Sequence, residues 1–170
     1  MNTGIAYTGI PSAEELATCP GVPTEMRMKK GRVAVIECVQ QIPCNPCEGA
    51  CPVGAITIGD QITNLPFIDG EKCTGCGLCI VRCPGLAITV VNKALNGSEA
   101  SVDFPFEYIP LPAEGDIVDA VGRDGQPVCK GRILKVKKLS SYGGTTVISM
   151  AIPAEYADTV RSMKRLPADR

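Results

Sequence analysis

The chain has 170 residues, 45% of them hydrophobic, so it is long enough to bury a core in one domain or in two small ones. Its 17 basic and 18 acidic side chains give a formal net charge of -1, which argues against a protein built to bind polyanions such as nucleic acids. The absence of His excludes His-ligated zinc, Rieske clusters and His-based nucleophilic triads within this chain. Against that absence stand 10 Cys residues, so sulfur chemistry is the strongest functional signal in the sequence.

Residues 1–30 are predicted to form an irregular N-terminal docking arm with one short helix. Ser12 and Glu15 have the spacing of a capping box, and Cys19-Pro20-Gly21 would end the helix. The first ten residues lack the basic and apolar regions of a signal peptide, and no window approaches 18 consecutive apolar residues. We therefore expect a cytoplasmic protein with no membrane contact, in which closely spaced Cys residues bind metal more often than they form disulfides.

Residues 31–92 contain an internal repeat, because Cys44 and Cys76 begin matching patterns 32 positions apart. The matching positions are Cys44, Cys47, Cys51 and Pro52 in the first half and Cys76, Cys79, Cys83 and Pro84 in the second. Short apolar segments at 35–37 and 67–69 precede the two Cys loops, and similar segments at 55–58 and 87–90 follow them. Each half is therefore predicted to be a short strand, a Cys loop with about one helical turn, and a second short strand.

The second half reads C-x2-C-x2-C-x3-C-P from Cys73 to Pro84. Two-residue spacers let one loop wrap three thiolates around a cubane cluster while peptide N–H groups point at the sulfurs. Gly75 and Gly77 permit the close backbone approach and positive φ that such a loop needs. The fourth Cys of such a run lies too far round to complete its own cluster and ligates the other cluster instead.

This run, present twice, resembles the bacterial two-cluster ferredoxins over roughly residues 31–92. The resemblance implies two 4Fe-4S clusters and an α+β fold, with a two-cluster ferredoxin-like repeat at 31–92. It gives cluster B the ligands Cys73, Cys76, Cys79 and Cys51, and it gives cluster A the ligands Cys44, Cys47, Cys83 and one more.

The first half departs from the family pattern at the fourth ligand of cluster A. Gln41 occupies the position that matches Cys73, and the nearest earlier thiol is Cys38, so the loop is three residues longer. We favour Cys38 as the ligand, because the alternative is a three-thiolate site with a labile iron and Cys38 as a buried structural residue.

Other roles for the thiols fit the spacing less well. Four-Cys zinc sites use two C-x2-C pairs, whereas this chain has two interleaved quartets each closed by Cys-Pro. Disulfide stapling is disfavoured without secretion. A catalytic Cys would need a positioned base, so no catalytic residue is assigned. Cys19 is expected to be a turn residue and Cys129 a core residue.

Residues 93–170 are predicted to form a small β-rich domain, either a β-barrel or a meander, with a terminal helix. Residues 99–119 carry six acids and no Lys or Arg, and their three Pro residues favour edges and turns. Strands are expected at 116–121 and 128–139 around an Asp-Gly turn, and at 145–152. Residues 154–166 have the apolar spacing and the charge distribution of an amphipathic helix.

Basic residues concentrate in the predicted strand at 128–139. They alternate with apolar residues, which favours a solvated strand face over a site for phosphate or for an acidic partner such as residues 99–119. The basic residues are Lys130, Arg132, Lys135, Lys137 and Lys138.

Two clusters in a small fold, with no other site for substrate chemistry, indicate electron transfer. The additional residues on either side of the repeat favour a small subunit of a multi-subunit oxidoreductase. Together, the altered first run at 42–52 and the second run at 73–79 are similar to iron–sulfur subunits of flavin-dependent amine or amino-acid dehydrogenases, including hydroxyproline dehydrogenase-type complexes. That resemblance implies a flavin on a partner chain. The alternatives are a free-standing ferredoxin-type carrier and a non-redox interaction module stapled by its clusters.

Overall fold

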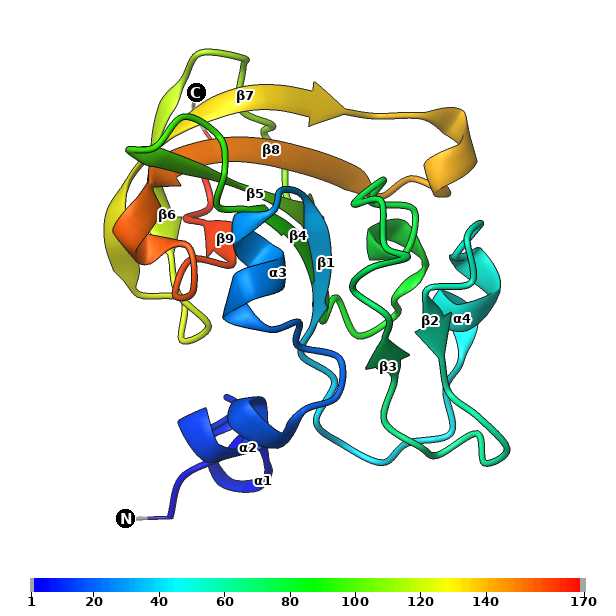
Figure 1. The fold of residues 1–170 in the computed structure, drawn as a ribbon. Helices are drawn as coiled ribbons and strands as arrows, with labels where there is room; N and C mark the ends of the chain where they lie inside the picture. Colours follow the sequence, from blue (N-terminus) through cyan, green and yellow to red (C-terminus); the bar gives the residue numbers. More distant parts are fainter. Residues whose placement is uncertain (1, 169–170) are drawn as a thin grey trace.

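The computed structural model describes residues 2–168, and its fold is α+β with mostly antiparallel sheet and few helices. A seven-stranded sheet has the strand order β1-β4-β5-β8-β7-β6-β9, and β2 pairs with β3 in a separate two-stranded sheet. The long strands β5, β7 and β8 lie across one side of the molecule, while β2, β3 and the helix α4 lie on another (Figure 1). The predicted division into 1–30, 31–92 and 93–170 stays a prediction.

The two halves of the repeat exchange their strands. β1 (Val33–Ile36) of the first half pairs with β4 (Ile88–Asn92) of the second, and β2 (Ile56–Thr57) pairs with β3 (Phe67–Ile68) in the same crossed manner. The Cys loops contain helical turns at matching places, namely α4 (Pro46–Ala50) and the 3-10 turn η1 (Ile80–Arg82). This crossed pairing brings the two Cys loops next to each other.

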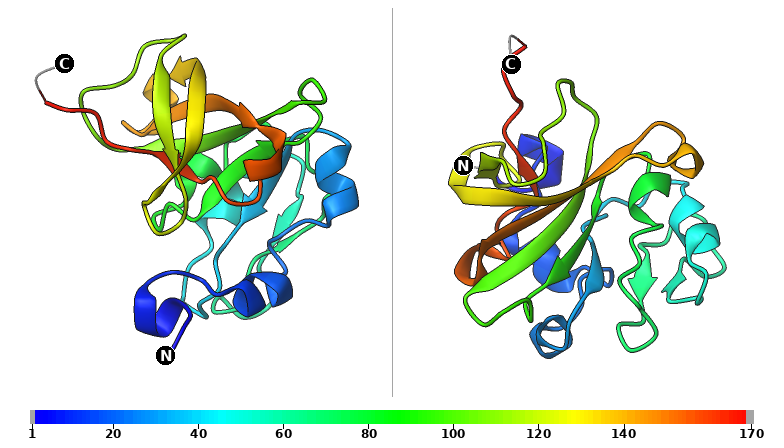
Figure 2. Two further views of the ribbon diagram at one scale, coloured as in Figure 1. Left: turned by 90° about the vertical axis from the view of Figure 1, so that its left-hand side faces the viewer. Right: turned by 90° about the horizontal axis from the view of Figure 1, so that it is seen from above.

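The large sheet continues beyond the repeat because β4 pairs with β5 (Glu99–Phe106). From there the sheet passes through β8 (Thr146–Pro153), β7 (Pro127–Lys137) and β6 (Ile117–Val121) to β9 (Ser162–Met163). The barrel expectation is wrong, since among the described strands β1 and β9 are the two ends of an open sheet and do not pair with each other. Only the consecutive antiparallel strands β6, β7 and β8 have the meander order, and the long strands curl without closing (Figure 2).

The central strand β5 corrects the expectation of edges and turns around Pro105. Residues 99–106 pair with β8 along their whole length, whereas their pairing with β4 ends at Asp103. A Pro within a strand removes an N–H donor, and the pairing of β5 with β4 stops two residues before Pro105, so no paired β4 residue lies opposite it. Phe104 and Phe106, on either side of Pro105, are buried in the core.

The predicted helix at 154–166 is also wrong. Ala154–Tyr156 (η3) forms a 3-10 turn, residues 157–159 continue as a turn, and the chain then enters β9 at Ser162. The Arg161 and Lys164 amides donate to the carbonyls of Val121 and Asp119 in β6 rather than to carbonyls one turn back. Val160 and Met163 are buried as the pattern requires, but pairing with the exposed edge of β6 replaces the helix.

The N-terminal residues contain three short helices, α1 (Ile5–Thr8), α2 (Ala13–Thr18) and α3 (Glu25–Lys29). The capping box of Ser12 and Glu15 is confirmed in α2. Between α2 and α3 the chain bridges the two sheets, because the carbonyl of Gly21 accepts from Ile36 and that of Pro20 accepts from Ile68. The arm thus attaches to the repeat, with α1 and α2 at the far end from β7 and β8 (Figures 1 and 2). Docking by this arm stays a prediction.

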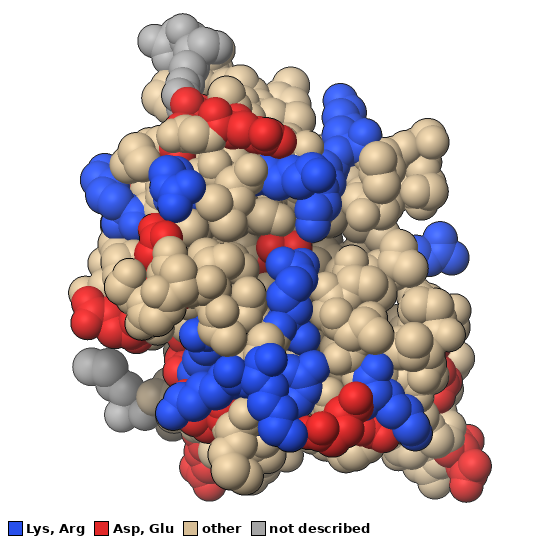
Figure 3. Space-filling view, turned by 45° about the horizontal axis from the view of Figure 1, so that its top comes forward, with Lys and Arg blue, Asp and Glu red and all other residues tan. Residues whose placement is uncertain are grey.

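Lys130 and Arg132 of β7 are exposed, as a solvated strand face requires, but three basic residues of β7 also pair with the acidic segment, which was the disfavoured alternative. Ion pairs join Lys130 to Asp119, Arg132 to Glu99 and Lys137 to Asp103, so each acid comes from the acidic segment 99–119. Basic and acidic side chains lie side by side over part of this surface (Figure 3). The remaining 3-10 turn, η2 (Ser140–Tyr142), connects β7 to β8.

Candidate metal centre

Two cavities lie between the crossed halves of the repeat, and each is lined by four thiols. Cavity A has about 380 Å³ of empty space and contains Cys38, Cys44, Cys47 and Cys83 in its wall. Cavity B has about 310 Å³ and contains Cys51, Cys73, Cys76 and Cys79. These are the two quartets that the ferredoxin resemblance implies, and each borrows one thiol from the opposite half of the repeat.

The exchange of thiols follows from the local backbone. α4 carries Cys47 and ends at Cys51, while η1 follows Cys79 and ends at Cys83. Cys51 has φ -81° and ψ 108°, and Cys83 has φ -82° and ψ 110°, so both residues leave their helical turns in the same extended conformation. The following Pro has no N–H and a fixed φ, which redirects the chain and turns the last thiol toward the other cavity.

The arrangement of the thiols fits a cluster better than a single ion. Among residues 2–168, no group of three or more His, Cys, Asp or Glu side chains converges closely enough to hold one metal ion. Four thiolates around a cavity are instead the donor set of a 4Fe-4S cluster, which takes one thiolate at each iron.

Backbone amides already point at three of these sulfurs. The Sγ atoms of Cys51 and Cys83 accept from the amides of Ala55 and Ala87 at 3.2 and 3.4 Å, which are matching positions of the repeat. The Sγ of Cys73 accepts from the amide of Ala34 in β1 at 3.4 Å. Such N–H···S bonds stabilise thiolate charge and tune an iron–sulfur centre.

The environment of the thiols opposes ionisation in the absence of metal. Burial, reinforced by Cys73 and Cys76, raises the pKa of Cys79 to about 12. Burial, reinforced by Cys83, raises the pKa of Cys47 to about 11, and burial also raises the pKa of Cys38. Metal must therefore displace protons from these thiols, which links cluster loading to the folding of this region.

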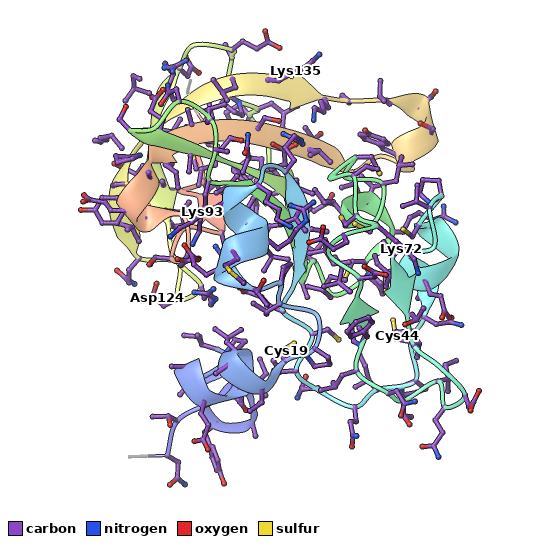
Figure 4. The ribbon with its side chains drawn as sticks, viewed as in Figure 1. Cys19, Cys44, Lys72, Lys93, Asp124 and Lys135 are labelled. Atoms are coloured by element: carbon purple, nitrogen blue, oxygen red, sulfur yellow. The ribbon has the colours of Figure 1, made fainter. Side chains whose placement is uncertain are left out.

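The two remaining thiols lie outside the cavity walls. Cys19 is buried where the arm meets β1, and its Sγ lies 3.4 Å from the carbonyl oxygen of Ile36. Figure 4 shows Cys19 near the arm, whereas Cys44 of cavity A lies beside β2. Cys129 lies half-buried in β7. Neither Cys19 nor Cys129 is brought into a quartet.

Sequence reasoning missed two Arg residues that hold the loop of cavity B. Arg27 of α3 donates to the carbonyls of Gly31, Arg32, Gly70 and Cys73, and Arg32 donates to the carbonyl of Gly75. Arg32 also pairs with the buried Asp103 of β5 at 2.6 Å. Because most of these partners are backbone carbonyls, no residue pattern in the sequence could have identified them.

Comparison with known proteins finds a family match over the segment that contains both Cys quartets. Residues 37–87 match the 4Fe-4S dicluster domain family. The translation initiation factor RLI1 of Chaetomium thermophilum is 31% identical over 126 residues, which cover 65% of this chain and 20% of that protein. The uncharacterized ferredoxin MJ0155 of Methanocaldococcus jannaschii is 34% identical over 87 residues, covering 50% of this chain and 54% of that protein.

A further relative belongs to the Na(+)-translocating ferredoxin:NAD(+) oxidoreductase complex of Acetobacterium woodii, and this complex component is 46% identical over 48 residues. The match covers 28% of this chain and 14% of that component. This chain thus spans about a fifth of the translation factor and less of the complex component. No solved structure matches the chain.

None of the helices in residues 2–168 has the length and apolar character needed to cross a membrane. The dicluster match includes all eight thiols of the two cavities, and the ferredoxin relative shares half of the chain. The chain thus contains a segment that matches the 4Fe-4S dicluster domain, and it is similar to a ferredoxin over half of its length.

Proposed function

We propose that the chain is an electron-transfer subunit with a 4Fe-4S cluster in each cavity. Cys38, Cys44, Cys47 and Cys83 would hold cluster A, and Cys51, Cys73, Cys76 and Cys79 would hold cluster B. The observation that carries the proposal is the division of eight thiols between two cavities, with one thiol crossing over in each direction. A bound cluster of this type takes up and releases one electron at a time.

The residues of the chain supply what such a centre requires. Ile36, Ile58 and Ile88 line cavity A, and Ile56 lines cavity B, so the thiolates would lie in an apolar shell. An apolar shell limits solvent access, and amide hydrogen bonds to sulfur offset part of the thiolate charge. Cys76 alone among the eight thiols is exposed, which gives cluster B a short path to a partner.

Exposed apolar side chains support a subunit over a diffusing carrier. They lie on or next to the segments that build the two cavities, where an aqueous surface would favour polar residues. These residues are Ile42, Val53, Ile62, Phe67, Leu78 and Leu86. The similarity to a protein named as part of an oxidoreductase complex supports the same choice. A flavin-dependent dehydrogenase as the partner enzyme rests on the sequence resemblance alone, and a cytoplasmic location rests on the residue patterns of the chain.

Anaerobic purification of the untagged protein from its own cells tests this proposal. A permanent subunit should elute from size exclusion with a flavoprotein whose absorbance follows the iron absorbance. Elution as a monomer that exchanges electrons with several reductases would contradict the subunit and favour the free-standing carrier.

The fourth ligand of cluster A has its own test. Cys38→Ser should change the EPR signal of one cluster and leave the other intact, whereas Cys129→Ser, the matched control outside the cavities, should preserve both. If Cys38→Ser kept both signals unchanged, Cys38 would be a structural residue instead.

A second candidate function rests on a different observation. The match to a translation initiation factor covers 65% of the chain and so extends beyond the dicluster segment. This favours an interaction module whose clusters hold a binding surface in shape. Under that alternative, dithionite in an anaerobic EPR titration would reduce neither cluster, whereas the electron-transfer proposal predicts reduction.

A further inference from the structure

We infer that the residues around cavity B give cluster B a higher reduction potential than cluster A. This inference rests on the proposed assignment of a cluster to each cavity. Reduction adds a negative charge to the cluster, so nearby positive charge and N–H···S bonds raise its potential and nearby negative charge lowers it. Because the two sites are built from a repeat, equivalent positions can be compared directly.

The first difference is a backbone donor. Ala34 and Pro66 are equivalent in the 32-residue repeat, and they line cavity B and cavity A respectively. The amide of Ala34 donates to the Sγ of Cys73 at 3.4 Å. Pro66 has no N–H to donate, so the matching position offers cavity A no such bond.

The second difference is a carboxylate. Glu48 of α4 and Ile80 of η1 are equivalent in the repeat, and each directly follows a buried cysteine of its own half. Glu48 follows Cys47 and accepts from the amide of Ile58, a residue of the cavity A wall, at 2.9 Å. Within residues 2–168, no Lys or Arg forms an ion pair with Glu48. A half-buried negative charge therefore lies beside cavity A, where cavity B has an apolar side chain.

The third difference is the guanidinium of Arg27. It donates to the carbonyl of Cys73 at 2.8 Å, and all of its hydrogen bonds go to backbone carbonyls. Across the described part of the chain, no carboxylate forms an ion pair with Arg27. A half-buried positive charge is therefore held against the loop of cavity B without a compensating acid.

Glu37 and Arg82, which are next to residues of the cavity walls, are paired or exposed. Ala34, Ile36 and Cys38 line the two cavities, so the even-numbered residues of this segment face the clusters. Glu37 therefore points to the other side of β1, where it meets Arg123 and Arg161. Arg82, next to Cys83, is exposed, and water and salt screen its charge.

A potentiometric titration monitored by EPR tests the inference, with the two clusters resolved as two one-electron steps. Glu48→Gln keeps an acceptor for the Ile58 amide but removes the charge, and it should shift the lower-potential step upward while the upper step stays in place. Pro66→Ala restores an N–H beside cavity A and should shift the lower step in the same direction. A shift of the upper step in either variant would overturn the assignment.

The complementary variant is Arg27→Gln, which should shift the upper step downward. Arg27→Lys retains the charge and should keep the upper step near its original potential, which separates charge from loss of loop structure. Lys30→Gln, on the exposed residue that follows α3 and pairs with Glu71, is the matched control and should move neither step.

The inference would be overturned if Arg27→Gln moved the lower step. It would also be overturned if Glu48→Gln, Pro66→Ala and Arg27→Gln all left both steps in place. Failure of the proposed function looks different: the wild-type protein would then lack two EPR-active clusters before any variant is made.

Discussion

Gly75 shows how closely the loop of cavity B is packed against Arg32, the residue before β1. Its φ is +65°, and a Cβ added there would lie 2.5 Å from the Cβ of Arg32 and 2.8 Å from the Arg32 carbonyl carbon. Gly54 has a similar φ of +61° but open space around it, and Leu86 occupies the equivalent position of the second half with φ +53°. A side chain at position 54 would thus meet only an unfavourable backbone conformation. A side chain at position 75 would meet the same conformation and would also clash with Arg32.

Gly75→Ala should therefore destabilise the holo-protein by about 3 kcal/mol, from a left-handed backbone and a backbone clash together. Gly54→Ala should cost only about 1 kcal/mol. Anaerobic thermal unfolding of both variants, with iron content measured on the same samples, checks the difference. Equal losses of stability in the two variants would contradict the packing argument.

At the scale of residues, the spacing in the sequence predicted the cysteine ligands but not the Arg residues that hold the loop of cavity B. Seven cysteines follow from two C-x2-C-x3-C-P runs and the remaining Cys of the complete second run, and Cys38 follows as the nearest earlier thiol. Arg27 and Arg32 act through backbone carbonyls of distant segments, so their roles depend on tertiary contacts that no local pattern encodes.

The element that joins the repeat to the C-terminal strands is an ion cluster at the end of β1. Glu37 accepts from Arg123, in the turn between β6 and β7, and from Arg161, just before β9. The Glu37 side chain is only 11% exposed. Burial raises the pKa of Glu37, but hydrogen bonds and charges from Arg123 and Arg161 outweigh burial and hold that pKa below its ordinary value of 4.5.

Glu37→Gln should cost about 3 kcal/mol at neutral pH, because it leaves two partly buried guanidiniums without their acid. A lowered pKa in the folded state means that the contribution of Glu37 is complete above the unfolded pKa and is lost as pH falls through the folded value. The stability difference between wild type and Glu37→Gln should therefore shrink below about pH 4.5. Denaturant unfolding at several pH values measures it, and a difference that grew on acidification would contradict this account.

At the scale of elements, the sequence predicted where strands lie along the chain better than it predicted which strands pair. The expected strands at 116–121, 128–139 and 145–152 correspond to β6, β7 and β8. The helix at 154–166 failed because helical spacing also suits a short segment whose apolar residues enter the core while its amides bond to β6. β5 was missed because Pro105 argues against a strand that is paired on both sides, and the point at which β4 stops pairing with β5 is set by the fold.

On the scale of the whole molecule, one sheet links the repeat to the C-terminal strands. The β5–β8 pair covers eight residues of each strand and buries Phe104, Ile148 and Met150 completely. The β2–β3 pair has only two residues per strand, and seven of the nine residues between these strands are exposed or only partly buried. The Cys loops and the small sheet thus depend on metal for order more than the long strands do.

Removal of iron by an anaerobic chelator should therefore unfold the protein locally. Hydrogen exchange should accelerate strongly in 38–84, where the thiols lie, while the amides of β5 and β8 stay protected. Mass spectrometry of peptides from holo- and apo-protein measures both regions in one experiment. Uniform exchange across both regions would show instead that the sheet and the Cys loops form one cooperative unit.

The central claim is that eight thiols in two cavities hold two 4Fe-4S clusters. Iron and acid-labile sulfide analysis of anaerobically purified protein tests this claim most directly. The account predicts about eight iron and about eight sulfide per chain. Colourless protein that contains zinc, or iron without sulfide, would contradict it.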